Sequence, residues 1–336
     1  MSKLILITGA SSGLGLSHAI YLTNKGYTVI GTSRNASALD RDELGNRYKR
    51  DNKQWKVKQR NEKWETKKKK SLIPSEIEEK LPTLLEKIHY ITMDVTSDSS
   101  VEEAIKQVQA KAKKLGYDGI DVLINNVGLG FYGSIEELPM AAWEQSFQTN
   151  VLGMIRVIKA VVPDMRKRRA GQIINTSSLG GEISIPFQGH YSATKAAVKA
   201  FTTSLRMELE PFGIKVSTVL PGDINTSFNK NTVALTQEQN ALESIDVQQL
   251  IDNLPSSADS PYYDRLKQAW KVIVKNLIES PPPLVVSKKI HKIIKSKHPK
   301  VNYKAGDFSQ ILFSFLIRRL LPDGLTNKFV EKYYGL

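Results

Sequence analysis

A tyrosine and a lysine four residues apart, Tyr191 and Lys195, form a pair that can carry out acid–base chemistry. They open a segment with helical periodicity, and residues i and i+4 share one face of a helix. The ammonium group of Lys195 then lies near the phenol of Tyr191, where a cation stabilises the phenolate. We expect this contact to lower the pKa of Tyr191 from its usual value of about 10 toward neutrality, where a general acid or base works best.

A serine, Ser178, ends a strand-like run 13 residues before Tyr191. Ligands of open parallel sheets bind at the carboxyl ends of the strands. Ser178 and the Tyr191 pair are therefore predicted to lie on one rim of such a sheet.

The first apolar run ends in the glycine-rich turn Thr8-Gly-Ala-Ser-Ser-Gly-Leu-Gly15 and leads into a helical segment. Such a turn directs free backbone N–H groups and the positive end of a helix dipole at a phosphate. Its glycine spacing is GxxxGxG, and a tight strand-to-helix connection is the alternative interpretation. Because the turn follows the first strand, we favour a dinucleotide phosphate.

The second strand closes with Ser33-Arg34, where a dinucleotide site usually has an acidic residue on the adenosine ribose. A guanidinium group suits a 2′-phosphate, which a carboxylate would repel. The sequence therefore favours NADP(H) over NAD(H). A solvated surface arginine is the alternative.

These residues need a scaffold, and the chain alternates strand-like runs with helical segments. This alternation predicts an α/β fold: a Rossmann-type, doubly wound parallel sheet of about seven strands with helices on both faces. Six strands can be placed: Leu4–Thr8, Val29–Thr32, His89–Met93, Val122–Ile124, Gln172–Asn175 and Lys215–Leu220.

Two segments interrupt the alternation. A basic insertion of about residues 41–74 follows the second strand, and a helix after it is predicted from a capping box at Ser75–Glu78 and from apolar residues at helical spacing. Residues 229–283, with Tyr262, Tyr263 and Trp270, are interpreted as a cap over the substrate pocket. We expect residues 1–283 to form the catalytic domain and residues 284–336 to be a basic, amphipathic extension packed on it as a helical cap.

Composition narrows the class of protein. The 336 residues are 40% hydrophobic and 24% charged, as in ordinary globular proteins. The absence of cysteine excludes disulfides and thiolate nucleophiles, and five scattered histidines predict no metal site. The net charge of +14 is concentrated in residues 41–70 and 284–336, which leaves a near-neutral body. No signal peptide precedes the first strand, so we expect a cytoplasmic protein.

Together with Asp94 in Met-Asp-Val-Thr, Asn-Asn-Val-Gly at 125–128, Asn150 in Thr-Asn-Val-Leu-Gly and Pro-Gly-Asp-Ile-Asn-Thr at 221–226, these motifs follow a known order. The chain resembles a short-chain dehydrogenase/reductase of the single-domain branch, over residues 1 to about 228. The resemblance implies that Tyr191 protonates a carbonyl oxygen, Ser178 holds that oxygen, Lys195 lowers the pKa of Tyr191 and grips the nicotinamide ribose, and Asn150 binds a relay water.

The resemblance also implies a set of cofactor-binding residues. Val127 departs from the family pattern, which has alanine there. Beside Tyr191 and Lys195, the implied cofactor contacts are Gly9, Ser11, Ser12, Gly13, Leu14, Gly15, Ser33, Arg34, Asp94, Val95, Asn126, Val127, Gly128, Pro221, Gly222, Ile224 and Thr226.

The segment between Ser178 and Tyr191 is apolar and predicts a bulky apolar substrate. Ile183 and Phe187 are expected to contact it, together with Ser178 and Tyr191. The local sequence resembles hydroxysteroid and retinol dehydrogenases, and the NADP(H) preference favours reduction of a ketone over oxidation of its alcohol. His190 is left out of the catalytic set because its side chain points about 100° away around the helix.

Three questions of association stay open. Residues 308–321 are too short and too charged to span a bilayer, and they fit either a lid helix, which we favour, or a peripheral membrane contact. The resemblance implies a homodimer. The run Lys67–Lys70 with Trp55 and Trp64 allows a rival hypothesis, a non-catalytic Rossmann scaffold that binds nucleic acid or a membrane through its basic insertion and tail. We disfavour it because Tyr191 and Lys195 are both kept.

Overall fold

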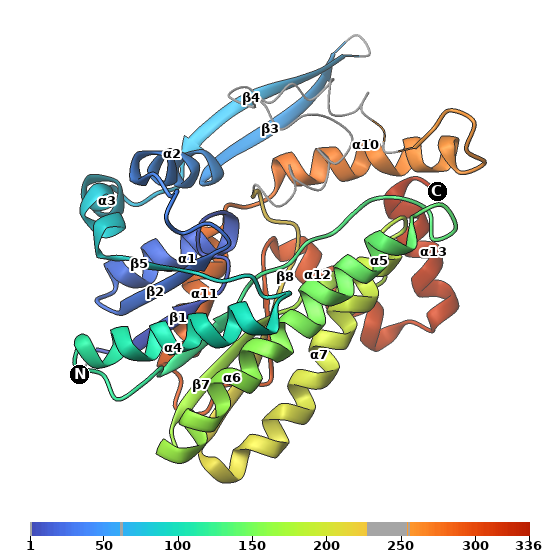
Figure 1. Cartoon of the computed structure of the whole chain (residues 1–336). Coiled ribbons are helices and arrows are strands. Elements are labelled where there is room, and N and C mark those ends of the chain that lie inside the picture. The colour runs from blue at the N-terminus through green and yellow to red at the C-terminus, as the bar shows by residue number, and fades with distance from the viewer. Residues whose placement is uncertain (1, 61–62, 227–253, 255) are drawn as a thin grey trace.

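A computed structural model describes residues 2–60, 63–226, 254 and 256–336. Its main sheet has seven parallel strands in the order β5-β2-β1-β6-β7-β8-β9 (Figure 1). The predicted doubly wound parallel sheet is confirmed. Its strands are β1 (Leu4–Ile7), β2 (Thr28–Ser33), β5 (His89–Thr92), β6 (Val122–Asn125), β7 (Gly171–Thr176), β8 (Ile214–Pro221) and β9 (Asn302–Ala305).

Helices cover both faces of this sheet. One side holds α1 (Gly13–Asn24), α3 (Ser75–Lys87) and α11 (Leu284–Lys295), and the other holds α4 (Asp98–Lys114), α6 (Gly153–Arg168) and α7 (Gly189–Leu209). The remaining α-helices among the described residues are α2 (Arg41–Asp51), α5 (Met140–Phe147), α10 (Tyr263–Glu279), α12 (Phe308–Leu320) and α13 (Asp323–Tyr334).

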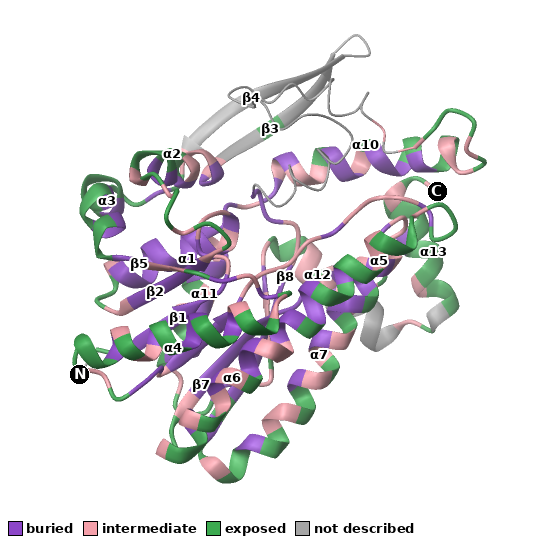
Figure 2. Ribbon diagram, in the orientation of Figure 1, coloured by how far each residue is buried: buried purple, intermediate pink, exposed green. Residues whose placement is uncertain are grey.

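The alternation of side chains along each strand explains why helices must cover both faces of the sheet. Successive side chains of a strand point to opposite faces, so a strand buried on both sides is apolar throughout. In β1, Ile5 and Ile7 belong to the core under α1 and α11, while Leu4 and Leu6 belong to the core under α4 and α6. All four are fully buried, as the purple strands in Figure 2 show.

The seventh strand was expected but not placed. Residues 284–305 supply α11 and β9, so they complete the main sheet and are not an extension beyond it. β9 is hard to recognise because its sequence is Asn-Tyr-Lys-Ala and only Ala305 is buried. The register Leu220↔Lys304 and Pro221↔Ala305 places this strand directly beside the end of β8.

The basic insertion folds as a helix and a hairpin. Asp40 caps α2 by accepting from the backbone N–H groups of Asp42 and Glu43. An antiparallel pair follows, β3 (Lys53–Arg60) and β4 (Lys63–Ser71), and β3 lies alongside α10. The side chains of Trp55 and Trp64 lie outside the described parts of the chain.

The helix predicted after the insertion is present as α3, and Ile77, Leu81, Leu84 and Leu85 are buried. The predicted capping box is wrong. The N-cap residue is Pro74, which makes no side-chain capping bond, and Ser75 already lies inside the helix.

The predicted cap is described from α10 onward, because residues 227–253 and 255 lie outside the described ranges. Trp270 of α10 is fully buried and packs at the centre of a third cluster that also includes Ile273 and Val274. Phe187 and Tyr334 pack against this cluster. Within the described ranges, no helix has the length and apolar character that a bilayer crossing requires.

Candidate active site

Tyr191, Ser178 and Lys195 meet at the carboxyl end of β7. Tyr191 and Ser178 are joined by a side-chain hydrogen bond. The Nζ of Lys195 lies 5.6 Å from the centre of the Tyr191 ring and donates to the carbonyl oxygen of Thr176 at 3.1 Å. The oxygen of Ser178 accepts from the Gly180 N–H at 3.0 Å. The three predicted residues therefore converge on one rim.

Backbone contacts hold α7 against the end of β7. The Ser177 hydroxyl donates to the carbonyl oxygen of Lys195 at 2.7 Å. A Cβ on Gly181 would lie 2.6 Å from that carbonyl, so only glycine permits this approach. The Ser192 hydroxyl accepts from the Ile185 N–H at 3.0 Å and fixes the loop before α7. These contacts fix the positions of Tyr191 and Lys195 relative to Ser178.

The electrostatics differ from the sequence-based expectation. Burial raises the pKa of Tyr191 to about 12; the hydrogen bond with Ser178 lowers it and the charge of Asp223 raises it. Burial also lowers the pKa of Lys195 to about 8, since a low-dielectric site disfavours the ammonium. The predicted fall in the Tyr191 pKa is therefore not observed, because burial is the largest effect and it raises the pKa. The phenol is protonated at neutral pH.

Asn150 lies in a π-helical turn, Gln148–Leu152, between α5 and α6. π-Turns inside helices often occur at functional sites. The Asn150 amide accepts from the Leu129 N–H and donates to the Leu129 carbonyl, both at 2.8 Å, and donates to the Thr194 hydroxyl at 3.0 Å. A Cβ on Gly128 would lie 3.2 Å from the Nζ of Lys195 and 3.4 Å from the Oδ1 of Asn150. Gly128 thus keeps Lys195 and Asn150 close together.

His190 is a structural residue. Its Nε2 accepts from the Phe131 N–H at 2.9 Å, and burial lowers the pKa of the imidazole to about 4. A neutral ring is required for this acceptor role. His190 therefore fixes the loop after β6 beside the site.

The glycine-rich turn is built for close backbone approach. Gly9 adopts a φ of 67°, in the left-handed region that favours glycine. A Cβ on Gly15 would lie 2.2 Å from the Gly9 carbonyl oxygen. Gly13 begins α1, so the N-terminal end of this helix faces the turn that holds Ser11 and Ser12. This cradle fits a dinucleotide pyrophosphate.

Asn126 and Val127, which directly follow β6, contact the glycine-rich turn. The Asn126 amide donates to the carbonyl oxygens of Thr8 and Gly9 at 3.2 and 3.4 Å. The backbone N–H groups of Asn126 and Val127 donate to the Thr8 hydroxyl at 2.9 and 3.2 Å. A Cβ on Gly9 would meet the Val127 side chain at 3.0 Å. The side chain of Val127, which stands where the family pattern has alanine, therefore packs against the glycine-rich turn.

One arginine follows β2, and a second contacts the glycine-rich turn. Arg34 follows β2 directly and is exposed. Arg47 of α2 donates from Nη1 to the carbonyl oxygen of Ser11 at 3.3 Å and pairs with Glu43. The insertion therefore brings a second guanidinium group to the glycine-rich turn.

Asp94 and Val95 follow β5. The Oδ1 of Asp94 accepts from the backbone N–H and the hydroxyl of Thr96 at 2.9 and 2.7 Å, so the carboxylate also caps a turn. Val95 is buried in the core against Gly153.

The loop after β8 runs beside Ser178. The carbonyl oxygen of Pro221 accepts from the Ser178 hydroxyl at 3.4 Å, and a Cβ on Gly222 would lie 3.2 Å from the Leu179 side chain. Ile224 and Thr226 are buried. The loop therefore shares the rim with the Tyr191 pair.

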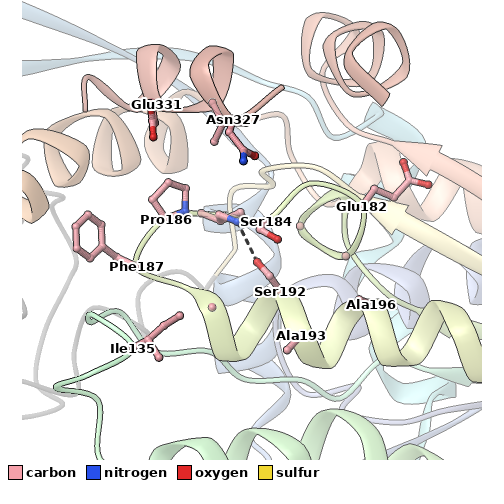
Figure 3. Close-up of a pocket in the computed structure, with 15 residues that line it drawn as sticks. Ile135, Glu182, Ser184, Pro186, Phe187, Ser192, Ala193, Ala196, Asn327 and Glu331 are labelled. Atoms are coloured by element: carbon pink, nitrogen blue, oxygen red, sulfur yellow. Dashed lines mark hydrogen bonds between the residues drawn. The ribbon is translucent and has the colours of Figure 1, made fainter. Parts of the chain in front are cut away.

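Beyond Ser178 and Tyr191, the two predicted substrate residues differ in their placement. Phe187 lines a cavity of about 680 Å³ between residues 180–189, α7 and α13 (Figure 3). Ile135, Ile185 and Val330 add apolar walls. Ile183 is not among the residues that line it. The α7 residues in the wall are Gly189, Ser192, Ala193 and Ala196, and in the sequence they alternate with Tyr191 and Lys195 on the adjoining helix face.

Three residues of the site were not predicted: Arg47, Asp223 and Gln310. Arg47 lies in the insertion, whose fold the charge pattern did not predict. Asp223 lies within the Pro-Gly-Asp motif but was assigned no role. Gln310 lies at the start of α12 and donates to the Oδ2 of Asp223 at 2.7 Å. No local sequence pattern predicts this contact. Among the described residues, no group of three or more histidines, aspartates and glutamates is placed to hold a metal ion.

Comparisons with known proteins agree with this geometry. The family model described as short chain dehydrogenase matches residues 65–237. The chain is 31% identical to 3-ketodihydrosphingosine reductase from Bacteroides thetaiotaomicron, over 99% of this chain and 98% of that protein. It is 32% identical to human retinol dehydrogenase 8 over 69% of this chain and 62% of that protein.

A solved short-chain dehydrogenase from Streptomyces avermitilis superposes with a TM-score of 0.64 at 26% identity, covering 98% of this chain and 96% of that one. Sequence, fold and the order of the site residues point the same way. The chain belongs to the short-chain dehydrogenase family of oxidoreductases.

Proposed function

We propose that this protein is an NADP(H)-dependent oxidoreductase that interconverts a bulky apolar ketone and its secondary alcohol. The observation that carries the proposal is the hydrogen bond between Tyr191 and Ser178, with the Lys195 ammonium 5.6 Å from the tyrosine ring. Ser178 and Tyr191 can both bond a carbonyl oxygen placed between them. Two polarising hydrogen bonds make the carbonyl carbon more electrophilic.

Tyr191 is the proton donor in this proposal. A reduced nicotinamide, when bound, would supply the hydride for the carbonyl carbon. Tyr191 transfers its proton to the carbonyl oxygen, so the C=O group becomes CH–OH, and Lys195 stabilises the resulting phenolate. Burial holds the pKa of Tyr191 at about 12, so the phenol keeps its proton until the oxygen develops charge.

The cofactor fits the turn between β1 and α1. Gly9 and Gly15 leave room for a pyrophosphate against the backbone, and the N-terminal end of α1 favours its negative charge. We assign Arg34 and Arg47 to the 2′-phosphate, because Arg34 directly follows β2, Arg47 contacts Ser11 of the glycine-rich turn, and guanidinium groups bind phosphate well. We assign Lys195 and Asn150 to the nicotinamide side and Asp94 to the adenine side.

Apolar surfaces near the site support a lipid-like substrate. Phe187 and Tyr132 pack against the buried cluster around Trp270. Relatives of this chain are named for sphingoid, retinoid and steroid substrates, all of which are bulky and mostly apolar. A long-chain or polycyclic ketone is therefore the proposed substrate class.

The C-terminal helices serve as a lid in this proposal. Gln310 of α12 reaches the loop after β8, which places that helix over the site. Phe308 and Leu312 are exposed on the same helix, so this segment keeps an apolar surface for peripheral contact with a membrane from the cytoplasmic side. Exposed Phe147, Leu152 and Met207, on α5, the π-turn and α7, support a homodimer through these helices.

A coupled assay tests the function. The purified chain is incubated with NADPH or NADH and a panel of long-chain, retinoid and steroid ketones, and the alcohol product is identified by mass spectrometry. We expect one mole of NADPH oxidised per mole of alcohol, with NADH used less well. If NADH is used as efficiently as NADPH, the assignment of Arg34 and Arg47 to the 2′-phosphate is wrong. If the protein reduces none of the ketones, the proposed function is wrong.

A further inference from the structure

Glu182 is a carboxylate that the proposed reaction does not use, and a single turn of backbone joins it to Ser178. The Ser178 hydroxyl oxygen accepts from the Gly180 N–H at 3.0 Å, and the Ser178 carbonyl oxygen accepts from the Gly181 N–H at 3.0 Å. The Glu182 N–H donates to the Leu179 carbonyl oxygen at 2.9 Å. Because the turn is hydrogen-bonded at each step, the position of Glu182 constrains the position of Ser178.

The Glu182 side chain binds lysines from two other elements. Its Oε1 accepts from the Nζ of Lys199 at 2.8 Å, and its Oε2 lies 2.7 Å from the Nζ of Lys304. Lys199 belongs to α7 and Lys304 to β9. Glu182 therefore ties its turn both to the helix that carries Tyr191 and Lys195 and to the last strand of the main sheet.

Both contacts of Glu182 join ionised groups. Burial raises the pKa of Glu182, but the bonds from Lys199 and Lys304 together lower it by more, so the pKa lies below its usual value. The carboxylate is therefore ionised at neutral pH. Hydrogen bonds between ionised groups are stronger than neutral ones. The Glu182 side chain is only 8% exposed, so water competes little for these bonds.

Lys304 connects this carboxylate to the lid helix α12. Its Nζ donates to the hydroxyl of Ser314, which is buried. The distance between the two atoms is 3.0 Å. One turn earlier on α12, Gln310 donates to the Oδ2 of Asp223 at 2.7 Å and accepts from the Asp223 N–H at 3.1 Å. These contacts dock α12 on β9 and on the loop after β8.

The first turns of α12 keep large apolar side chains in solvent. Phe308 is 75% exposed and Leu312 is 41% exposed. Segments with few buried apolar contacts open at a low cost in free energy. The polar contacts of Gln310 and Ser314 therefore have a large influence on whether this helix is docked.

We propose that Glu182 is a positioning residue that couples the docking of α12 to the placement of Ser178. With α12 docked, Ser314 and Glu182 share the Lys304 ammonium group, which fixes Glu182 and with it the Ser178 turn. When α12 moves away, water replaces Ser314 and competes with Glu182 for this ammonium group. The inference rests on the proposed function, which gives Ser178 its role, and it makes closure of the lid complete the catalytic rim.

The first test is Glu182→Gln, which keeps the shape of the side chain and removes its charge. With a ketone that the wild-type protein reduces, we expect kcat to fall at least about tenfold, as for the loss of a hydrogen bond between charged groups. NADPH affinity stays at the wild-type value, and amide hydrogen exchange in α12, followed by mass spectrometry, becomes faster. Glu208→Gln, which removes an exposed carboxylate from α7, changes none of these quantities.

The second test starts from the lid. Ser314→Ala removes the hydroxyl that Lys304 binds and leaves Glu182 in place. We expect faster amide exchange in residues 178–183, together with a lower kcat. Ser309→Ala, at an exposed position of the same helix, changes neither quantity.

These measurements separate the coupling from the proposed function. If the wild-type protein reduces none of the ketones, the proposed function is wrong, and the exchange rates in the two variants still support or refute the coupling. A wild-type kcat in Glu182→Gln overturns the inference. An equal loss of kcat and NADPH affinity also overturns it, because Glu182 then only supports the fold. Should Glu182→Gln not fold, Ser314→Ala decides: unchanged exchange in residues 178–183 overturns the proposal.

Discussion

The Nη1 of Arg47 donates to the carbonyl oxygen of Ser11 at 3.3 Å, which joins the basic insertion to the glycine-rich turn. The insertion helix is therefore part of the cofactor site that we propose. We predict that Arg47→Ala raises the KM for NADPH about tenfold and leaves the KM for NADH unchanged, because a charge-assisted bond to the 2′-phosphate is lost.

Lys49→Ala is the matched control, since Lys49 lies on the exposed face of the same helix. Steady-state kinetics with both cofactors measure the effect. An equal loss with NADPH and NADH would show that Arg47 only supports the turn.

Gly15 packs against the turn too closely to bear a side chain. A Cβ there lies 2.2 Å from the Gly9 carbonyl oxygen and 2.7 Å from the Asn126 amide nitrogen. We predict that Gly15→Ala weakens NADPH binding at least about tenfold and lowers the melting temperature, since the backbone must shift. Fluorescence titration of NADPH and thermal melts measure both.

Gly324→Ala is the control for this substitution, because a Cβ on that residue of α13 meets nothing within 4 Å. It should leave both quantities unchanged or raise the melting temperature slightly. Wild-type NADPH affinity in Gly15→Ala would contradict the assignment of the turn.

Lys195 makes stability depend on pH in a defined direction. Burial lowers its pKa from the usual 10.5 to about 8 in the folded chain. Between these two values the unfolded chain binds more protons, so the free energy of unfolding rises with pH by up to about 3 kcal/mol. Below pH 8 both states hold the proton, and this contribution is absent.

Denaturant unfolding of wild type and Lys195→Met at several pH values isolates this effect, because the other groups cancel in the difference. We expect the stability of wild type relative to the variant to increase from about pH 8 to pH 10. A difference that does not change with pH would mean that the ammonium is well solvated.

The sequence predicted the sheet and the proximity of Ser178, Tyr191 and Lys195 well because their signals are local. Apolar runs placed six strands, and the Tyr191 to Lys195 spacing placed both residues on one helical face. β9 was missed because its sequence, Asn-Tyr-Lys-Ala, lacks an apolar run and the strand gains its place only by pairing with β8. The hairpin in the insertion was missed because lysine-rich strands resemble solvated loops.

The pKa of Tyr191 could not be predicted from the sequence, for a different reason. The spacing correctly brought Lys195 near the ring, but the direction of the shift depends on how deeply the phenol is buried and on Asp223, which lies 32 residues later in the chain. Neither can be read from a five-residue motif. The contact between Asp223 and Gln310 spans 87 residues and has no local signature.

The most direct test of the central claim is Tyr191→Phe, because it removes one hydroxyl and keeps the ring. NADPH oxidation is followed with a ketone that the wild-type protein reduces, and NADPH affinity is measured in parallel. We predict that kcat falls at least about a hundredfold, since proton donation is lost, while NADPH affinity and melting temperature stay near the wild-type values. Reduction of the ketone at the wild-type rate by Tyr191→Phe would contradict the account.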